Sequence, residues 1–270
     1  MIYRLVVLDI DGTIVDSNRR ISTRLAAAIA EAQRRGAIVT LATGRMLKSA
    51  LRFARELNLA GPVVAYQGAI TASASDGHII RHARLSDRAA AEAFDRLEAF
   101  PGQISVHVDG AVYARAVGEW ARGYEQRMGI EMQLVPELHV LAAQRPTLIL
   151  AVDTPNTISP LVANLRTALE GRALVTHSLP HFCEIASPEA GKALALDELT
   201  RELGVFRREV IAFGDGAGDA SMLEWAGLGV AIDGGHPDAL AAAGRTTGTP
   251  SEDGVAEVLE ELLDSNRLGA

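Results

Sequence analysis

Three short apolar runs, each ending in or followed directly by polar residues, limit the fold of this chain more than any other feature of its sequence. The runs cover residues 3–8 (YRLVVL), 37–43 (AIVTLAT) and 209–214 (EVIAFG). Continuous apolar runs of this length are typical of strands that are buried on both faces of a parallel sheet. A helical pattern follows the first run over residues 22–35, with Ser22 as a predicted N-cap. This alternation predicts an α/β fold with a doubly wound, mainly parallel, Rossmann-like core.

The pattern changes between residues 84 and 186. A hairpin, a strand near residues 130–135 and a short helix near residues 137–143 are expected there, and the whole stretch predicts an antiparallel sheet with helices on one face. Strand–helix alternation returns after this stretch. We therefore predict a core domain built from residues 1–83 and 187–270, with an α+β domain of residues 84–186 inserted into it. A chain of 270 residues is long enough for two domains.

Charge and composition exclude several classes of function. The formal net charge of −8 disfavours a basic nucleic-acid groove. The single cysteine, Cys183, excludes an internal disulfide and a thiolate zinc site, and we expect it to act as a small hydrophobic residue. No apolar stretch approaches the roughly 18 residues that a membrane span needs, and no export signal is evident. We therefore expect a cytoplasmic protein without nucleic-acid or membrane partners, as a monomer or weak homodimer.

The polar residues at the ends of the apolar runs are expected to meet. In an open α/β sheet the carboxyl ends of the parallel strands share one edge, and ligands bind there. The residues concerned are Asp9, Asp11, Thr43, Asp215 and Asp219. Carboxylates packed this closely repel one another, and a hard cation such as Mg²⁺, which prefers oxygen ligands, removes that repulsion.

Lysine is rare in this chain and marks one further candidate. All 26 basic residues except Lys48 and Lys192 are arginine, so a position that remains lysine suggests a need for a compact charge. We assign Lys48 to an exposed helix face. With Lys192 added, the acidic cluster and Thr43 predict a metal-assisted phosphoryl-transfer site, in which an aspartate can accept the phosphoryl group covalently.

Four segments resemble, in order and spacing, the four motifs of the haloacid dehalogenase-like phosphatase superfamily. They are Asp9-Ile10-Asp11-Gly12-Thr13 (DxDGT), Ala42-Thr43-Gly44-Arg45 (ATGR), the segment from Lys192 to Leu199 (KGxALxxL) and the segment from Gly214 to Leu223 (GDxxND followed by Met-Leu). The resemblance covers nearly the whole chain. The inserted domain lies between the second and third motifs, which is similar to the Cof-type or IIB branch with its mobile cap of type C2B.

The resemblance implies a role for each matching residue. Asp9 attacks phosphorus and becomes an aspartyl phosphate, and Asp11 protonates the leaving alcohol and then activates water. Mg²⁺ is held by Asp9, the backbone carbonyl of Asp11 and Asp215, and Asp219 supports or ligates it. Phosphate and substrate contacts are implied for Thr43, Gly44, Arg45, Gln67, Gly68 and Lys192, with an ion pair as the alternative role of Arg45. Phosphoryl transfer depends on such alignment and charge neutralisation.

The sequence departs from the motifs at three positions. Gly218 stands where the fourth motif has Asn, Ala193 where the third has Gly, and Gln67 where an Asn-Gly-Ala segment has Asn. Loss of one hydrogen bond to a charged group is worth about 1.5–3 kcal/mol. The change at residue 218 is therefore expected to weaken activity without abolishing it.

From these motifs we expect an Mg²⁺-dependent phosphatase that hydrolyses small phosphomonoesters, with sugar phosphates as the first candidate class, under a cap that excludes water. The alternatives are a phosphomutase and a binding-only, regulatory member of the superfamily. A single-domain response-regulator receiver does not suit the insertion, and the GDGAGD segment lacks dinucleotide-loop spacing. Substrate specificity is expected from residues 84–186 and Gln67.

Overall fold

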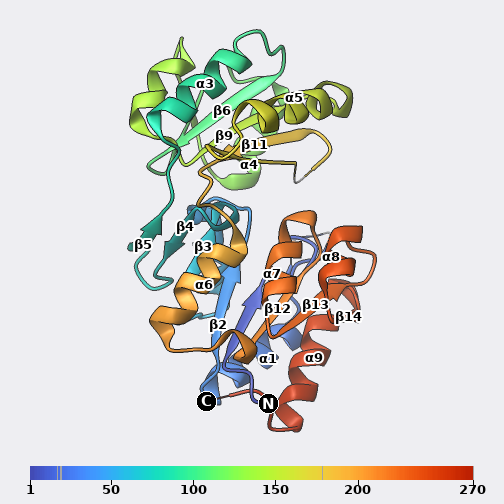
Figure 1. Ribbon diagram of the computed structural model, residues 1–270. Helices are drawn as coiled ribbons and strands as arrows, with labels where there is room; N and C mark the ends of the chain where they lie inside the picture. The colour runs from blue at the N-terminus through green and yellow to red at the C-terminus, as the bar shows by residue number, and fades with distance from the viewer. Residues whose placement is uncertain (17, 19, 178, 270) are drawn as a thin grey trace. The chain divides into compact units, whose positions relative to one another are not determined.

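Two compact units make up the part of the chain that the computed structural model describes, which is residues 1–16, 18, 20–177 and 179–269. One unit combines Met1–Arg81 with Gly191–Ala270, and the other is His82–Ala190 (Figure 1). The first unit is therefore discontinuous in sequence, and the second is inserted into it. The role of the second unit as a cap stays a prediction.

An eight-stranded sheet forms the centre of the first unit, with the strand order β14-β13-β12-β1-β2-β3-β4-β5. The strands are β1 (Leu5–Leu8), β2 (Ile38–Ala42), β3 (Val63–Ala65), β4 (Ile70–Ala72), β5 (Ile79–His82), β12 (Val210–Gly214), β13 (Leu228–Ile232) and β14 (Arg245–Thr247). Neighbours from β14 to β3 pair in parallel, and β4 runs antiparallel to β3. The predicted α/β class with a mainly parallel core is thus confirmed. The short, polar β14 was not predicted.

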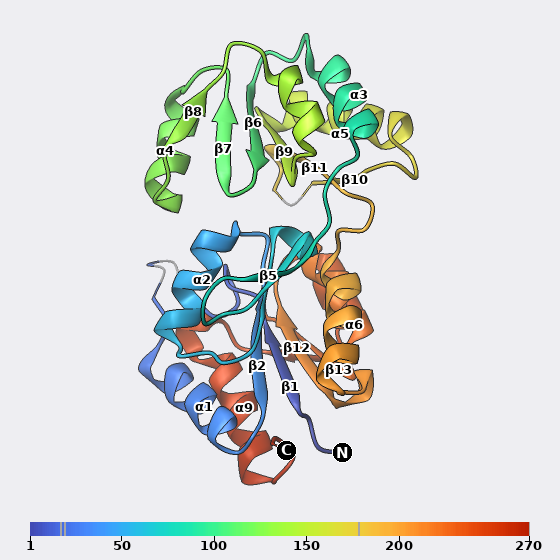
Figure 2. The ribbon, with the colours of Figure 1, turned by 90° about the vertical axis from the view of Figure 1, so that its left-hand side faces the viewer.

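Helices cover both faces of this sheet. They are α1 (Thr23–Arg34), α2 (Leu47–Glu56), α6 (Lys192–Leu203), α7 (Ala220–Trp225), α8 (Pro237–Ala242) and α9 (Gly254–Asp264). Figure 2 shows α1 and α9 on one face and α6 on the other. The predicted cap of α1 is confirmed, because Ser22 Oγ accepts a hydrogen bond from the Leu25 amide at 3.0 Å. A 3₁₀ turn, η1 (Tyr66–Gly68), joins β3 to β4, and another, η4 (Ala217–Asp219), follows β12.

The order of the strands places a binding edge at β1. All four residues of β1 are fully buried, and its last residue, Leu8, pairs with Leu41 of β2 and Phe213 of β12. After β1 the chain builds outward through β2 and β3, and it later returns to the other side of β1 with β12. This reversal is a topological switch point, where the loops after adjacent strands diverge and leave a crevice for ligands.

The second unit contains a six-stranded sheet with the order β10-β11-β9-β6-β7-β8. Its strands are β6 (Gln103–Val108), β7 (Ala111–Ala114), β8 (Met132–Leu134), β9 (Leu148–Val152), β10 (Leu174–Thr176) and β11 (Phe182–Ala186), and its helices are α3 (Asp87–Leu97), α4 (Glu119–Met128) and α5 (Pro155–Ala168). Apolar side chains of α3 and α5 share one core cluster with the sheet.

Two expectations for the second unit are corrected. Strand β8 runs parallel to β7, so the sheet is not wholly antiparallel. The helix α4 lies between these strands in sequence, and such a crossover is what a parallel connection requires. The short helix expected near residues 137–143 is a 3₁₀ helix, η2 (Leu138–Gln144).

Two composition-based expectations concern burial and membranes. Cys183 is fully buried, and this burial raises the pKa of its thiol to about 12. Among the helices of the described residues, none has the length and apolar character needed to cross a bilayer.

Candidate active site

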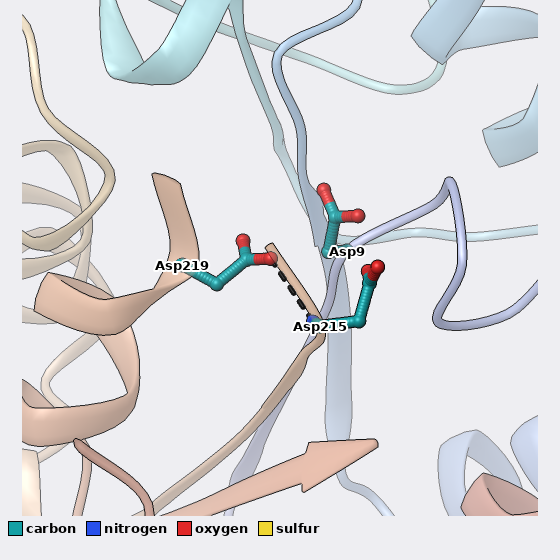
Figure 3. Close-up of side chains that lie close together, drawn as sticks. All are labelled: Asp9, Asp215 and Asp219. Carbon is teal, nitrogen blue, oxygen red and sulfur yellow. Dashed lines mark hydrogen bonds between the residues drawn. The ribbon is translucent and has the colours of Figure 1, made fainter. Parts of the chain in front are cut away.

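Three aspartates gather at the carboxyl edge of the first sheet. Asp9 follows β1, Asp215 follows β12, and Asp219 ends η4. One carboxylate oxygen from each lies within 4.8 Å of the others, and Figure 3 shows the three side chains close together. Asp9 and Asp219 are buried and Asp215 is partly exposed. Adjacent parallel strands therefore bring together carboxylates that are more than 200 residues apart in sequence.

Lys192, the first residue of α6, supplies a cation to this cluster. Its Nζ donates hydrogen bonds to Asp9 Oδ1 at 2.7 Å and to Asp219 Oδ1 at 2.5 Å, and its side chain is only 3% exposed. Burial alone would lower the pKa of Lys192, but the charges of Asp219 and Asp9 outweigh that effect and raise it. Lys192 is therefore a fixed positive charge between two carboxylates.

The two buried carboxyl groups that accept hydrogen bonds from Lys192, those of Asp9 and Asp219, have different roles. Burial raises the pKa of Asp9 well above its usual value, although Lys192 opposes this shift. Asp219 uses Oδ1 for Lys192 and Oδ2 for the amides of Asp215 and Gly216, at 3.1 and 2.8 Å. Both of its oxygens thus hold protein groups in place, and the second one fixes the loop that carries Asp215.

Thr13 and Gly12 place the side chain of Asp215. The buried Thr13 donates from Oγ1 to Asp215 Oδ1 at 2.9 Å. Burial raises the pKa of Asp215 to about 6, while this hydrogen bond lowers it and Asp219 raises it. Gly12 has a φ of +78°, and a Cβ built there would overlap the Asp215 carboxylate. Our residue assignments omitted Thr13 and Gly12, although both belong to the DxDGT segment.

The donor set fits a divalent cation. Three carboxylates and one ammonium leave an excess of negative charge, and all candidate ligand atoms are oxygens. Asp9 and Asp215 each use Oδ1 in a hydrogen bond to the protein, so their Oδ2 atoms are the natural ligands. Hard cations such as Mg²⁺ prefer such oxygens.

Asp11 does not join the three carboxylates. Its side chain is 58% exposed, and both of its oxygens accept hydrogen bonds from Arg45, at 2.6 and 2.5 Å. Arg45 in turn donates to Ser49 Oγ at 2.9 Å and lies over the ring of Phe53. Of the two roles considered for Arg45, the structure shows the ion pair. Acid–base chemistry by Asp11 would require this pair to open.

The residues expected to bind phosphate lie in three adjoining segments. Thr43 is buried after β2; its Oγ1 accepts from the Arg45 amide at 3.2 Å, and its carbonyl accepts from the Gln67 amide at 3.0 Å. A Cβ at Gly44 would lie 2.7 Å from Gln67 Nε2, and a Cβ at Gly68 would overlap the carbonyl of Gly191, next to Lys192. The loop after β2, the turn η1 and the start of α6 are therefore in contact.

Comparison with known proteins defines the class of this chain. The sequence profile of the haloacid dehalogenase-like hydrolases matches residues 6–259. The chain belongs to this family, and the prediction of a hydrolase of this superfamily is confirmed.

Several relatives share its full length. A curated protein of Bacillus subtilis (strain 168), named "Putative phosphatase YxeH", is 26% identical over 97% of this chain and 98% of its own. The crystal structure of a haloacid dehalogenase-like hydrolase from Bacteroides thetaiotaomicron superposes with a TM-score of 0.86 at 26% identity, covering 96% of this chain and 99% of that one. BT4131, described as a subclass IIB sugar phosphatase, has a TM-score of 0.83 at 21% identity, covering 96% and 98%. The last likeness shows that this chain and BT4131 share a fold.

Proposed function

We propose that this chain is an Mg²⁺-dependent phosphatase that hydrolyses small soluble phosphomonoesters through an aspartyl-phosphate intermediate. The observation that carries the proposal is the buried triad of Asp9, Lys192 and Asp219 beside the partly exposed Asp215. Family membership and a full-length relative named as a phosphatase support it. A phosphomutase of the same superfamily would use the same four residues, so the product of the reaction separates the two functions.

Asp9 is the proposed nucleophile. Its carboxylate forms a bond to phosphorus while the bond from phosphorus to the leaving alcohol breaks, and water then hydrolyses the aspartyl phosphate to inorganic phosphate. Lys192 holds Asp9 Oδ1 at 2.7 Å and so orients the attacking carboxylate. Mg²⁺, bound by Asp9, Asp215 and the Asp11 carbonyl with support from Asp219, would neutralise charge on the phosphoryl oxygens.

Asp11 is the proposed general acid and base. It would protonate the leaving alcohol and later take a proton from the attacking water. Because Arg45 occupies both Asp11 oxygens, we propose that substrate entry releases Asp11 and leaves Arg45 available to the phosphoryl group. Thr43, Gly44, Gln67, Gly68 and Lys192 complete the proposed phosphate site, which their contacts with one another support.

The second unit is proposed to be a C2B cap that reads the leaving group and excludes water from the reaction. Sugar phosphates are the proposed substrate class, in keeping with the motifs and with a fold shared with a subclass IIB enzyme. We further propose a cytoplasmic monomer or weak homodimer that acts without nucleic-acid or membrane partners.

The test is phosphate release from a panel of sugar phosphates, polyol phosphates and nucleotides, with Mg²⁺ and with chelator. Wild type and Asp95→Asn, an exposed aspartate of α3, are expected to release phosphate only with Mg²⁺. Asp9→Asn is expected to lose about 1,000-fold or more of the rate, because the nucleophile is gone. An Asp9→Asn variant with the activity of wild type would contradict the proposal, and isomerised product without phosphate release would indicate a mutase.

A further inference from the structure

The backbone at Gln67 is held in an unusual conformation at the edge of the site. Gln67 has a φ of 54° and Tyr66 a φ of 51°, and non-glycine residues rarely adopt this left-handed region. The Gln67 amide donates to the Thr43 carbonyl at 3.0 Å, and the next residue, Gly68, lies against the backbone of Gly191. Surrounding structure therefore fixes the direction in which the Gln67 side chain leaves the turn.

The Gln67 carboxamide lies between two glycines. A Cβ at Gly44 would be 2.7 Å from its Nε2, and a Cβ at Gly218 would be 3.1 Å from its Oε1 and 3.2 Å from its Nε2. These separations are shorter than ordinary contacts of a Cβ atom. The amide has room in this position because residues 44 and 218 both lack side chains.

One polar atom of this amide has no hydrogen-bond partner among the residues that the structure describes. Gln67 Oε1 is buried and makes no hydrogen bond to any residue that the structure describes. Buried polar groups are nearly always paired, so an unpaired one calls for a ligand or an ordered water. The carboxamide reaches Gly218, which lies in the loop between Asp215 and Asp219, and it reaches Gly44, which follows Thr43.

We propose that the Gln67 carboxamide binds the phosphoryl group and occupies the place that a side chain at residue 218 would fill, so that Gln67 and Gly218 act as a complementary pair. Nε2 donates to a phosphoryl oxygen, and Oε1 accepts from a water or a substrate hydroxyl. The two departures from the motifs at residues 67 and 218 then compensate for each other. The proposal rests on the phosphatase function given above.

A double-substitution cycle with inorganic phosphate tests the pair. Phosphate affinity, measured by calorimetry with Mg²⁺ present, is compared for wild type, Gln67→Ala, Gly218→Asn and the double variant. Gln67→Ala is expected to weaken phosphate binding ~10- to 100-fold, the range for one hydrogen bond to a charged group. Gly218→Asn is expected to weaken it too, because its side chain enters the space of the Gln67 amide.

The double variant gives the decisive result. The amide introduced by Gly218→Asn has room once Gln67 is shortened, so the double variant is expected to bind phosphate at least about fivefold more tightly than Gln67→Ala. If the fold-losses in phosphate affinity of Gln67→Ala and Gly218→Asn simply multiply in the double variant, the proposal is wrong. It is also wrong if Gln67→Ala binds phosphate like wild type. Gln67→Glu, which keeps the side-chain length but removes the donor and adds a negative charge, is expected to bind phosphate more weakly than Gln67→Ala.

Two control variants test whether the effects are specific to the pair of Gln67 and Gly218. An assay of phosphomonoester hydrolysis then separates this proposal from the phosphatase function on which it rests. Gln144→Ala removes an exposed glutamine, and Gly123→Asn adds a side chain where a Cβ meets no atom of the described residues within 4 Å. Both are expected to keep wild-type phosphate affinity, and thermal denaturation checks the folding of every variant. A wild-type protein that binds phosphate and shows the coupling but hydrolyses no phosphomonoester would contradict the phosphatase function and leave the pair supported.

Discussion

Replacement of Lys192 by methionine removes the ammonium group from the acidic cluster and keeps a side chain of similar length. In the wild type, Nζ lies 2.7 Å from Asp9 Oδ1 and 2.5 Å from Asp219 Oδ1, and all three side chains are buried. Removing one partner of a buried ion pair leaves an uncompensated charge and costs about 3–5 kcal/mol. We therefore expect Lys192→Met to lower the free energy of unfolding at pH 7 by this amount.

The loss of stability caused by Lys192→Met should become smaller as the pH falls. Burial already raises the pKa of Asp9 in the folded state, and loss of the ammonium raises it further. A carboxyl group whose folded pKa is raised stabilises the fold most at low pH and loses that stabilisation as the pH rises through the folded pKa. The difference in stability between wild type and Lys192→Met is therefore expected to shrink as the pH falls from 7 towards 4.

Urea denaturation at pH 7 and at acid pH, without added metal, measures both effects. Lys48→Met is the matched control, because Lys48 is the only other lysine and lies exposed on α2. Its effect is expected to stay within about 0.5 kcal/mol at every pH, as for ordinary surface substitutions. A loss below about 1 kcal/mol for Lys192→Met at pH 7, or a difference that grows towards acid pH, would refute the electrostatic reasoning.

Three further predictions concern Gly12, His107 and Thr13. Gly12→Ala and Gly110→Ala both place alanine at positive φ, which costs about 1–2 kcal/mol of stability. Only the Cβ added at residue 12 would overlap Asp215, so phosphatase assays should show a loss of activity for Gly12→Ala alone. Burial lowers the pKa of His107 to about 4. Acidification from pH 6.5 to 4 should therefore lower the free energy of unfolding of the wild type by up to about 3 kcal/mol more than that of His107→Gln. If urea denaturation shows the same difference in stability between the two proteins at both pH values, this prediction is wrong. Thr13→Val removes a hydrogen bond to Asp215 and should weaken Mg²⁺ binding several-fold in calorimetry, and unchanged affinity would remove Thr13 from the site.

The position of the acidic cluster could be predicted because it depends on strand order and burial. The apolar runs identify β1, β2 and β12 as buried parallel strands, and parallel strands end at one edge. Asp9, Asp215 and Asp219 then meet as a consequence of topology. The direction of β8 relative to β7 could not be predicted, because an apolar run looks the same in a parallel and in an antiparallel strand.

Contacts between side chains of different loops could not be predicted from the sequence. The ion pair of Arg45 with Asp11 and the place of the Gln67 amide beside Gly218 depend on side-chain directions that only the packed loops determine. Each loop follows a different strand, and local propensity holds no information about such distances. The resemblance assigned the Asp11 carbonyl to the metal and the Asp11 side chain to acid–base chemistry, and it did not identify Asp11 as the ion-pair partner of Arg45.

Chemical trapping of the phosphorylated enzyme tests the central claim most directly. Borohydride reduces an aspartyl phosphate to homoserine, and peptide mass spectrometry locates the changed residue. For wild type quenched during turnover of its best substrate with Mg²⁺, we expect homoserine at residue 9, and none in Asp9→Asn. Homoserine at another aspartate, or an unmodified Asp9 in enzyme that is turning over, would contradict the account.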